Sequence, residues 1–284
     1  MLYYLILTVS VVLFGVQFGF NQIYEKESDG SVRSSFLFVF GTAAVGIPIL
    51  WVINGVRLSC TVFSLIMAVV SSVNMILCNY CSLKALGRVN LSLFSIFSML
   101  GGMILPFVTG ILFFDEALTV GKLICLVILS VAVLITVDLK EKKSGMLYCF
   151  AVFVFNGLSG VISKLYTSLP FEKVSQAMFS LLCAAVCTAI AAVPLIILRK
   201  PPLRPTKKGL LATAGAGAFN RTANYLLLLS LAQLPASVQY PFVTGGVIIV
   251  STVISCLTGQ KPSKKEIVSM MLSFVGIALL LIIP

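Results

Sequence analysis

The chain has 284 residues, of which 59% are hydrophobic and only 10% are charged. A water-soluble domain carries about a quarter charged residues, so the composition excludes an ordinary soluble protein and indicates a polytopic membrane protein. The formal net charge of +11 does not indicate nucleic acid as a partner, because membrane proteins collect Lys and Arg in their cytoplasmic loops.

Ten apolar runs follow one another along the chain, separated by polar breaks that are too short to fold as domains. Each run has roughly the 20 residues needed to cross a bilayer core of about 30 Å as a helix. The first run lacks a preceding basic segment and an A-x-A cleavage site, so we expect a retained helix rather than a signal peptide. The sequence therefore predicts an all-α polytopic membrane protein with ten transmembrane helices, near residues 2–22, 33–54, 60–86, 90–114, 119–138, 146–168, 173–198, 208–232, 235–258 and 264–283.

Lys and Arg are distributed unevenly over the breaks between these runs. The breaks after the first, third, fifth, seventh and ninth runs hold 14 of them, whereas the other breaks hold only Arg57, Lys122 and Lys173. By the positive-inside rule the basic breaks face the cytoplasm. We therefore expect a multi-pass protein of the plasma or inner membrane with both termini on the extracytoplasmic side.

The sequence repeats weakly at a constant offset of 145 residues, without a gap. The pair Asn79-Tyr80, for example, recurs as Asn224-Tyr225. Each half holds five spans, an odd number, so the second half would enter the membrane upside down relative to the first. Inverted repeats of this kind are typical of secondary transporters, which bind substrate near the bilayer midplane between the halves. The two predicted repeats are residues 1–140 and residues 141–284.

A family resemblance rests on corresponding motifs of the two halves. The first half contains "LKALGRVNLSLFSIFSMLGG" followed by "FFDEALTVGKL", and the second contains "LSLAQLPASVQYPFVTGGVIIVSTVISCLTGQKPSKKE". Ten short helices in a 5+5 inverted repeat with these motifs resemble the drug/metabolite transporter superfamily, and within it the EamA-like exporters. In one respect the halves differ, because Glu116 of the first half falls opposite Lys261 of the second.

The segment "GAGAFNRTANYLLLL" places Arg221 in the middle of the eighth span. A charge at the bilayer centre costs about 2.5–3.5 kcal/mol on insertion scales, so Arg221 must find water, a partner or a ligand inside the bundle. Helical spacing puts Asn224 on the same stripe, with Tyr225 beside it. Two interpretations remain open: Arg221 binds substrate, or it is structural and bonds to neighbouring helices.

Lys164 in the sixth span is the second charge within an apolar run. Either it faces the cavity and couples transport to protons, or it reaches the outer interface as a snorkelling side chain. Other polar residues of the spans concentrate on the first, third, sixth and eighth helices, which would be the cavity walls if the resemblance holds, with the fourth and ninth nearby. The predicted substrate-binding residues are Arg221, Lys164, Asn224, Tyr225, Asn79, Tyr80, Asn74, Asn156, Gln17 and Tyr240.

All nine carboxylates lie in loops or at helix ends, and the chain has no histidine. For Asp115 and Glu116 we expect a helix-start or surface role at an outer turn, and Ser263 with Glu266 forms a predicted capping box. Cationic-drug antiporters of the resembled superfamily depend on a membrane-embedded carboxylate, so their mechanism is disfavoured here. A metal site at the two cysteines of "CNYC" is also disfavoured, because no second ligand pair has a suitable spacing.

These features favour a secondary transporter that works by alternating access and needs no cofactor or metal. Because Arg offers a planar fork of donors to carboxylate or phosphate, the substrate is predicted to be a small anionic or zwitterionic metabolite, such as an amino acid or organic acid, moved outward. The alternatives are a drug efflux pump and a flippase for a phosphate-bearing lipid carrier. An enzyme is not expected. The partners are a small-molecule substrate and the lipid bilayer, and a monomer is sufficient although a homodimer is compatible.

Overall fold

The computed structural model describes residues 2–86, 88, 91–135, 145–198, 205–257 and 263–283, without the side chains of Gln22, Glu25, Leu83, Leu86, residues 91–96, Ser255 and Leu257. Within these residues the chain is all-helical and has no strand, as predicted. The ten helices are α1 (Leu2–Glu27), α2 (Val32–Ile53), α3 (Val62–Leu86), α4 (Leu91–Phe113), α5 (Val120–Ile135), α6 (Met146–Ser168), α7 (Gln176–Ile197), α8 (Lys207–Leu231), α9 (Ala236–Leu257) and α10 (Lys264–Ile282).

Most of these helices are long and apolar enough to cross a membrane. Among the described residues 7 helices meet that requirement by length and composition, and α4 and α5 contain shorter apolar segments. The remaining helix, α8, carries Asn220, Arg221 and Asn224 in its middle. A helix that is less apolar than its neighbours fits a membrane bundle when its polar side faces the interior. The chain is therefore a multi-pass membrane protein.

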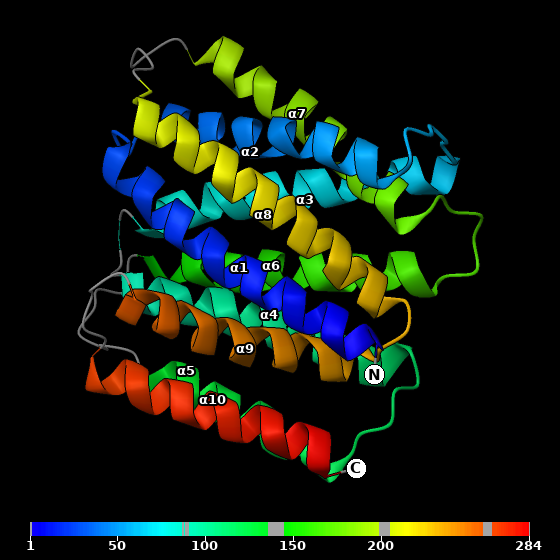
Figure 1. Ribbon diagram of the computed structural model, residues 1–284, viewed down its shortest axis with the longest axis vertical. Helices are drawn as coiled ribbons and strands as arrows, with labels where there is room; N and C mark the ends of the chain where they lie inside the picture. Colours follow the sequence, from blue (N-terminus) through cyan, green and yellow to red (C-terminus); the bar gives the residue numbers. More distant parts are fainter. Residues whose placement is uncertain are drawn as a thin grey trace.

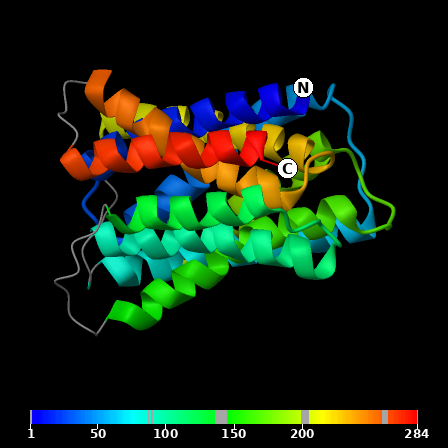
Figure 2. The ribbon, with the colours of Figure 1, turned by 90° about the horizontal axis from the view of Figure 1, so that it is seen from below.

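Successive helices run in alternating directions, so the connections lie alternately at two opposite ends of the bundle (Figure 1). Both termini lie at the same end, on the right in Figure 1, together with the α2–α3, α4–α5, α6–α7 and α8–α9 connections. Seen from below in Figure 2, α1, α9 and α10 lie on one side of the bundle and α4 and α5 on the other. The basic breaks of the sequence thus share the end opposite the termini. The predicted boundary between the two repeats, at residues 140 and 141, lies outside the described residues.

Helices of the first half pack mainly on helices of the second half. The contacts pair α1 with α8 and α9, α6 with α3 and α4, α2 with α7 and α8, α3 with α7, α4 with α9, and α5 with α10. Only α9 and α10 make a comparably extensive contact within one half. Most of the buried apolar clusters among the described residues therefore combine side chains of both halves, and the space at the centre of the molecule is bounded by both.

Several helices begin with a side-chain cap that satisfies a free backbone N–H. The hydroxyl groups of Ser31, Ser175 and Thr206 accept a hydrogen bond from the third residue beyond each of them. The predicted capping box is confirmed at α10, where Ser263 and Glu266 bind each other's backbone N–H groups.

Glycines allow α4 and α6 to approach backbone to backbone. A Cβ atom at Gly157 would lie 2.6 Å from the carbonyl oxygen of Gly101, and one at Gly101 would collide with the backbone of Phe153. Such close approach between membrane helices gains van der Waals contact that larger side chains would prevent.

We predict that Gly101→Ala destabilises the protein by about 1–3 kcal/mol, because the added methyl group forces α4 and α6 apart. The measurement is the melting temperature of the purified protein in detergent. Gly19→Ala in α1 is the matched control, since a Cβ atom there meets nothing within 4 Å. Equal melting temperatures for the two variants would contradict the importance of this contact.

Candidate substrate-binding cavity

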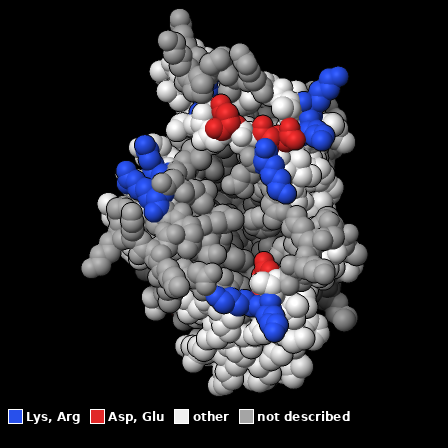
Figure 3. Space-filling view, turned by 90° about the vertical axis from the view of Figure 1, so that its left-hand side faces the viewer, with Lys and Arg blue, Asp and Glu red and all other residues white. Residues whose placement is uncertain are grey.

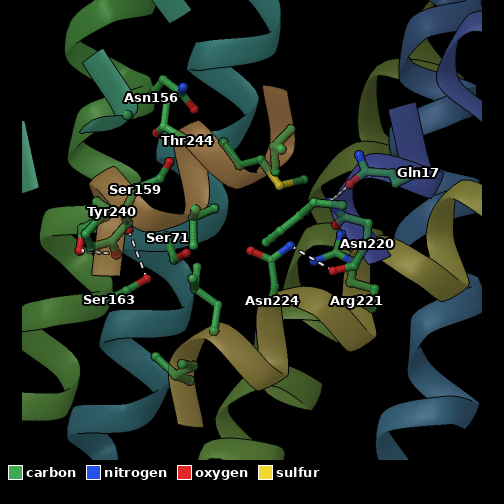
Figure 4. A pocket seen from close by; sticks show the side chains of 18 of the residues that line it. Gln17, Ser71, Asn156, Ser159, Ser163, Asn220, Arg221, Asn224, Tyr240 and Thr244 are labelled. Atoms are coloured by element: carbon green, nitrogen blue, oxygen red, sulfur yellow. Dashed lines mark hydrogen bonds between the residues drawn. The ribbon is translucent and has the colours of Figure 1, made fainter. Parts of the chain in front are cut away.

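A cavity of about 450 Å³ lies inside the bundle, roughly midway along the helices. Its described lining comes from α1, α3, α4, α6, α7, α8 and α9, so both halves contribute to it. Apolar side chains such as Phe14, Phe18 and Phe179 form part of the wall. The polar residues labelled in Figure 4 line the rest: Gln17, Ser71, Asn156, Ser159, Ser163, Asn220, Arg221, Asn224, Tyr240 and Thr244.

Arg221 is the one charged residue among the described residues that line the cavity. The stem of its side chain packs against Gly46 of α2, where a Cβ atom would collide with it. One guanidinium nitrogen, Nη2, lies 3.9 Å from the thiol of Cys187, and Nε has no hydrogen-bond partner. No described carboxylate forms a salt bridge with Arg221. Arg221 is only partly buried, but its Nε is buried and unpaired, so the guanidinium has unused donors whose hydrogen bonds an anionic group can accept.

Two amide side chains lie beside Arg221 on α8 (Figure 4). Asn220 Nδ2 donates a hydrogen bond of 2.9 Å to Gln17 Oε1 and so connects α8 with α1. Asn224 Nδ2 donates to the backbone oxygen of Asn220 at 2.8 Å. Asn224 lines the cavity, and its amide oxygen takes no part in the bond to Asn220. This side of the cavity is therefore polar and carries a positive charge.

The opposite wall, on α6 and α9, uses its polar groups mainly to join helices. Asn156 Nδ2 donates to the backbone oxygen of Ser98 on α4 at 2.6 Å. The hydroxyl of Tyr240 donates to the backbone oxygen of Gly160 at 3.0 Å. Both predicted residues therefore line the cavity, but their donors already have protein partners.

The structure brings together only half of the residues predicted to bind substrate. Gln17, Asn156, Arg221, Asn224 and Tyr240 line the cavity. The other five are Asn74, Asn79, Tyr80, Lys164 and Tyr225, and they are not among its described lining residues.

Two of these five residues take part in contacts between or within helices. Asn74 is buried and donates from Nδ2 to the backbone oxygen of Phe155 and to the hydroxyl of Ser159, both at 2.9 Å. Asn79 bonds to the backbone oxygen of Met75 in its own helix. These bonds satisfy donors that would otherwise be costly in hydrocarbon.

The two tyrosines of the repeated Asn-Tyr pair lie apart from the cavity. Tyr80 is 44% exposed on the outside of α3, with the ammonium group of Lys84 5.8 Å from its ring centre. Tyr225 packs against an apolar cluster that includes Leu50 and Leu228. Recurrence in sequence therefore does not place these two side chains at the site.

Sequence reasoning missed the contribution of α7 and of most hydroxyl groups. Phe179, Ser180 and Cys183 of α7 line the cavity, although α7 was not among the predicted walls. Its middle contains no strongly polar residue, so an unusual charge or amide could not mark it. A serine can satisfy its own hydroxyl on the preceding turn of the helix, which makes it a weak sequence signal for a site.

Lys164 is neither free in the cavity nor snorkelling, because it forms a buried ion pair with Glu116. Lys164 Nζ lies 2.6 Å from Glu116 Oε1, and the side chains are only 10% and 6% exposed. The surface role expected for Glu116 is therefore wrong. Its carboxylate also accepts hydrogen bonds of 2.8 Å from the backbone N–H groups of Ala236 and Ser237. Glu116 thus caps α9, a helix remote in sequence, rather than the adjacent α5.

The surroundings of Glu116 favour its ionised form. Burial by itself would raise the pKa of this carboxyl group, but the hydrogen bonds from Lys164, Ser237 and Ala236 outweigh burial and bring the pKa below its ordinary value. A carboxyl group whose pKa is lower in the folded than in the unfolded protein stabilises the fold wherever it is ionised in both states. That contribution is complete above the unfolded pKa of about 4.3 and is lost as the pH falls through the lower folded pKa.

We predict that the melting temperature of the protein in detergent falls below about pH 4.3 partly because Glu116 becomes protonated. Glu116→Gln should melt at a lower temperature at pH 7 and should show a smaller further decrease on acidification. The neighbouring Asp115 is exposed and has φ of +51°. Asp115→Asn is the matched control, because Asn tolerates this conformation. The same acid dependence in wild type and Glu116→Gln would contradict the prediction.

Comparisons with known proteins agree with the helical membrane architecture. A sequence model described as the EamA-like transporter family matches residues 143–282. No curated protein matches the chain significantly. A solved structure described as "Crystal structure of protein" is similar over 98% of this chain and 95% of its own, with a TM-score of 0.76 and 16% identity. At that identity the likeness shows the fold alone.

Proposed function

We propose that this chain, whose residues 143–282 match the EamA-like family of membrane transporters, moves a small anionic or zwitterionic metabolite by alternating access. The family and the all-helical membrane fold indicate a transporter of small molecules rather than an enzyme. The chemical class of the substrate is inferred from the cavity, as follows.

The single observation that carries the proposal is the guanidinium of Arg221 in a cavity without a described acidic residue. A positive charge with no described acidic partner in a cavity inside a membrane protein favours a ligand of the opposite charge, because the attraction is stronger there than in bulk water. The adjacent Asn224 amide can accept a hydrogen bond from an ammonium or hydroxyl group of the same ligand. A cation would instead be repelled, which disfavours efflux of cationic drugs.

The dimensions of the cavity favour a small substrate. Its volume of about 450 Å³ lies within the usual range for sites that enclose a small molecule. The apolar wall at Phe14, Phe18 and Phe179 can cover the nonpolar part of an amino acid or organic acid. A lipid-linked carrier would place only its head group in this space, so we favour the soluble metabolite over the lipid.

A symmetry in the helix contacts supports an inverted 5+5 repeat, with residues 1–140 and 141–284 as the two units. Exchanging each helix with the one five positions away converts the α1–α8 contact into α6–α3, α1–α9 into α6–α4, and α2–α8 into α7–α3. The same exchange leaves α2–α7, α4–α9 and α5–α10 unchanged. Because exchanged helices run in opposite directions in Figure 1, the two halves can rock about the cavity and open it to either side in turn.

The charge distribution supports an orientation in a plasma or inner membrane with both termini outside. The end opposite the termini carries exposed Lys207, Lys208, Lys264 and Lys265. Figure 3 shows Lys and Arg side chains on this end. By the positive-inside rule this end faces the cytoplasm. Loading from the cytoplasm fits the proposed direction, which is export.

We predict that carboxylate-bearing or phosphate-bearing metabolites raise the melting temperature of the purified protein, whereas quaternary ammonium compounds do not. A ligand at 100 times its dissociation constant stabilises the folded state by about 2.7 kcal/mol, which a melting curve detects. Arg221→Gln should abolish the response, because the amide cannot form the charged, two-point contact.

Arg57→Gln is the matched control, since Arg57 is exposed in the α2–α3 connection far from the cavity. The stabilising compound is then tested for flux into proteoliposomes. Stabilisation by cations alone, or an unchanged anion response in a folded Arg221→Gln protein, would refute the assignment of the substrate class. Transfer of a phosphate-bearing lipid between leaflets without flux of soluble compounds would instead favour a flippase.

We also predict that short epitope tags at the two termini are both accessible to antibodies on intact cells, or on spheroplasts where an outer membrane is present. A tag inserted in the α7–α8 connection should become accessible only after the membrane is permeabilised. Accessibility of the α7–α8 tag, with protected termini, would reverse the orientation.

A further inference from the structure

Glu116 fastens the α4–α5 turn of the first half to two helices of the second half. Its carboxylate receives the ammonium group of Lys164 on α6 at 2.6 Å and two backbone N–H groups at the start of α9 at 2.8 Å each. It rests directly on α4, since a Cβ atom at Gly110 would lie 2.7 Å from Glu116 Oε2. We call this set of contacts the Glu116 clamp.

The conformation of the turn directs Glu116 inward. Asp115 has φ of +51°, a left-handed conformation that Asp adopts more easily than most residues. The backbone N–H of Glu116 then donates to the oxygen of Gly110. Lys122 of α5 is buried and bonds through Nζ to the backbone oxygen of Ala117 at 2.5 Å, which holds the turn from the other side.

The Glu116 clamp lies immediately beyond the cavity, toward the end that carries the termini. On α6, Lys164 follows Ser163, which lines the cavity. On α9, the clamped residues Ala236 and Ser237 precede the lining residue Tyr240 by about one turn. The α4–α5 turn lies at the right in Figure 1, at the end that carries both termini. The clamp therefore closes the side of the cavity that we assign to the cell exterior.

Among the described residues, the proposed repeat places no ion pair equivalent to the Glu116 clamp at the other end. The residue 145 positions before Lys164 is Gly19, which has no side chain, and a Cβ atom there would meet nothing within 4 Å. The position equivalent to Glu116 is Lys261, which lies outside the described residues but is basic instead of acidic. An ion pair like that of the first half cannot form from these two residues. At that end Glu27 of α1 accepts a hydrogen bond of 2.7 Å from the hydroxyl of Thr206, the N-cap of α8, but this contact is exposed, whereas the Glu116–Lys164 pair is buried.

From this asymmetry we infer that the Glu116 clamp is the outer gate of the transporter and makes the cytoplasm-facing state its resting state. The inference rests on the proposed alternating-access function, because a gate has meaning only if the cavity opens to both sides. Opening outward must separate Glu116 from Lys164 and from α9. The Glu116 clamp thus keeps the cavity closed to the exterior until substrate binding shifts the equilibrium toward the outward-facing state.

The experiment measures the width of the outer end by spin labels, without any substrate. Labels are attached at Leu118→Cys in the α4–α5 turn and Gln233→Cys in the α8–α9 turn, both exposed on the outer end. The exposed native thiols, Cys60 and Cys256, are replaced by serine. With Glu116 intact, the two labels should give one short label-to-label distance. Glu116→Gln should add a second, longer distance and raise the ratio of outward-open to outward-closed molecules about tenfold or more, because hydrogen bonds to a charged group are lost.

Asp115→Asn, which leaves the clamp intact, should give the wild-type distance. If Glu116→Gln does not fold, the double variant Glu116→Gln/Lys164→Gln serves in its place, since it leaves no unpaired buried charge. An unchanged distance distribution in a folded variant overturns the inference, and so does failure of both variants to fold, which would make the pair structural. Flux of metabolites with unchanged distances refutes the gate alone, whereas shifted distances without flux of any probe refute the proposed substrate transport.

Discussion

The fold depends on one constraint, which is that a polar group inside a bilayer must find its partner within the protein. Hydroxyl groups such as those of Thr8, Ser82 and Thr109 do so within their own helix, by bonding to the carbonyl oxygen four residues earlier. Longer side chains such as Asn74 and Asn156 reach a neighbouring helix instead. Because these bonds join helices from different halves, they also fix how the halves lie together.

The same constraint separates structural from functional charges. Glu116 and Lys164 neutralise each other and have additional backbone donors, so their burial is balanced within the protein. Arg221 has only a weak contact with a thiol and an Nε without a partner. A buried pair that loses one member is costly, whereas a partly buried guanidinium with unpaired donors can still donate hydrogen bonds to a ligand. The molecule therefore combines a neutralised ion pair between its halves with a positive charge in the cavity that has no described counter-ion.

The extensive contacts between the halves have a consequence for motion. Every large helix contact except that of α9 with α10 joins one half to the other, so the halves cannot separate without losing the core. Rocking about the cavity remains compatible with this packing, since it exchanges contacts at the two ends while the crossings at glycines such as Gly101 and Gly157 persist. The contacts of Glu116 with Lys164 and α9 join the halves at the end that carries the termini, so an opening of that end would have to break them.

The sequence by itself determined the ten helices, the membrane location and the presence of a charge, Arg221, in the middle of a span, because span length and mid-membrane charge are local properties of the sequence. It also identified Gln17, Asn156, Asn224 and Tyr240 as residues that line the cavity. Only the tertiary structure decided that Glu116 reaches Lys164 and α9, that α7 is a cavity wall, and that Tyr80 faces outward. Helix periodicity defines the faces of a helix, but which face meets which neighbour depends on packing between residues more than a hundred positions apart.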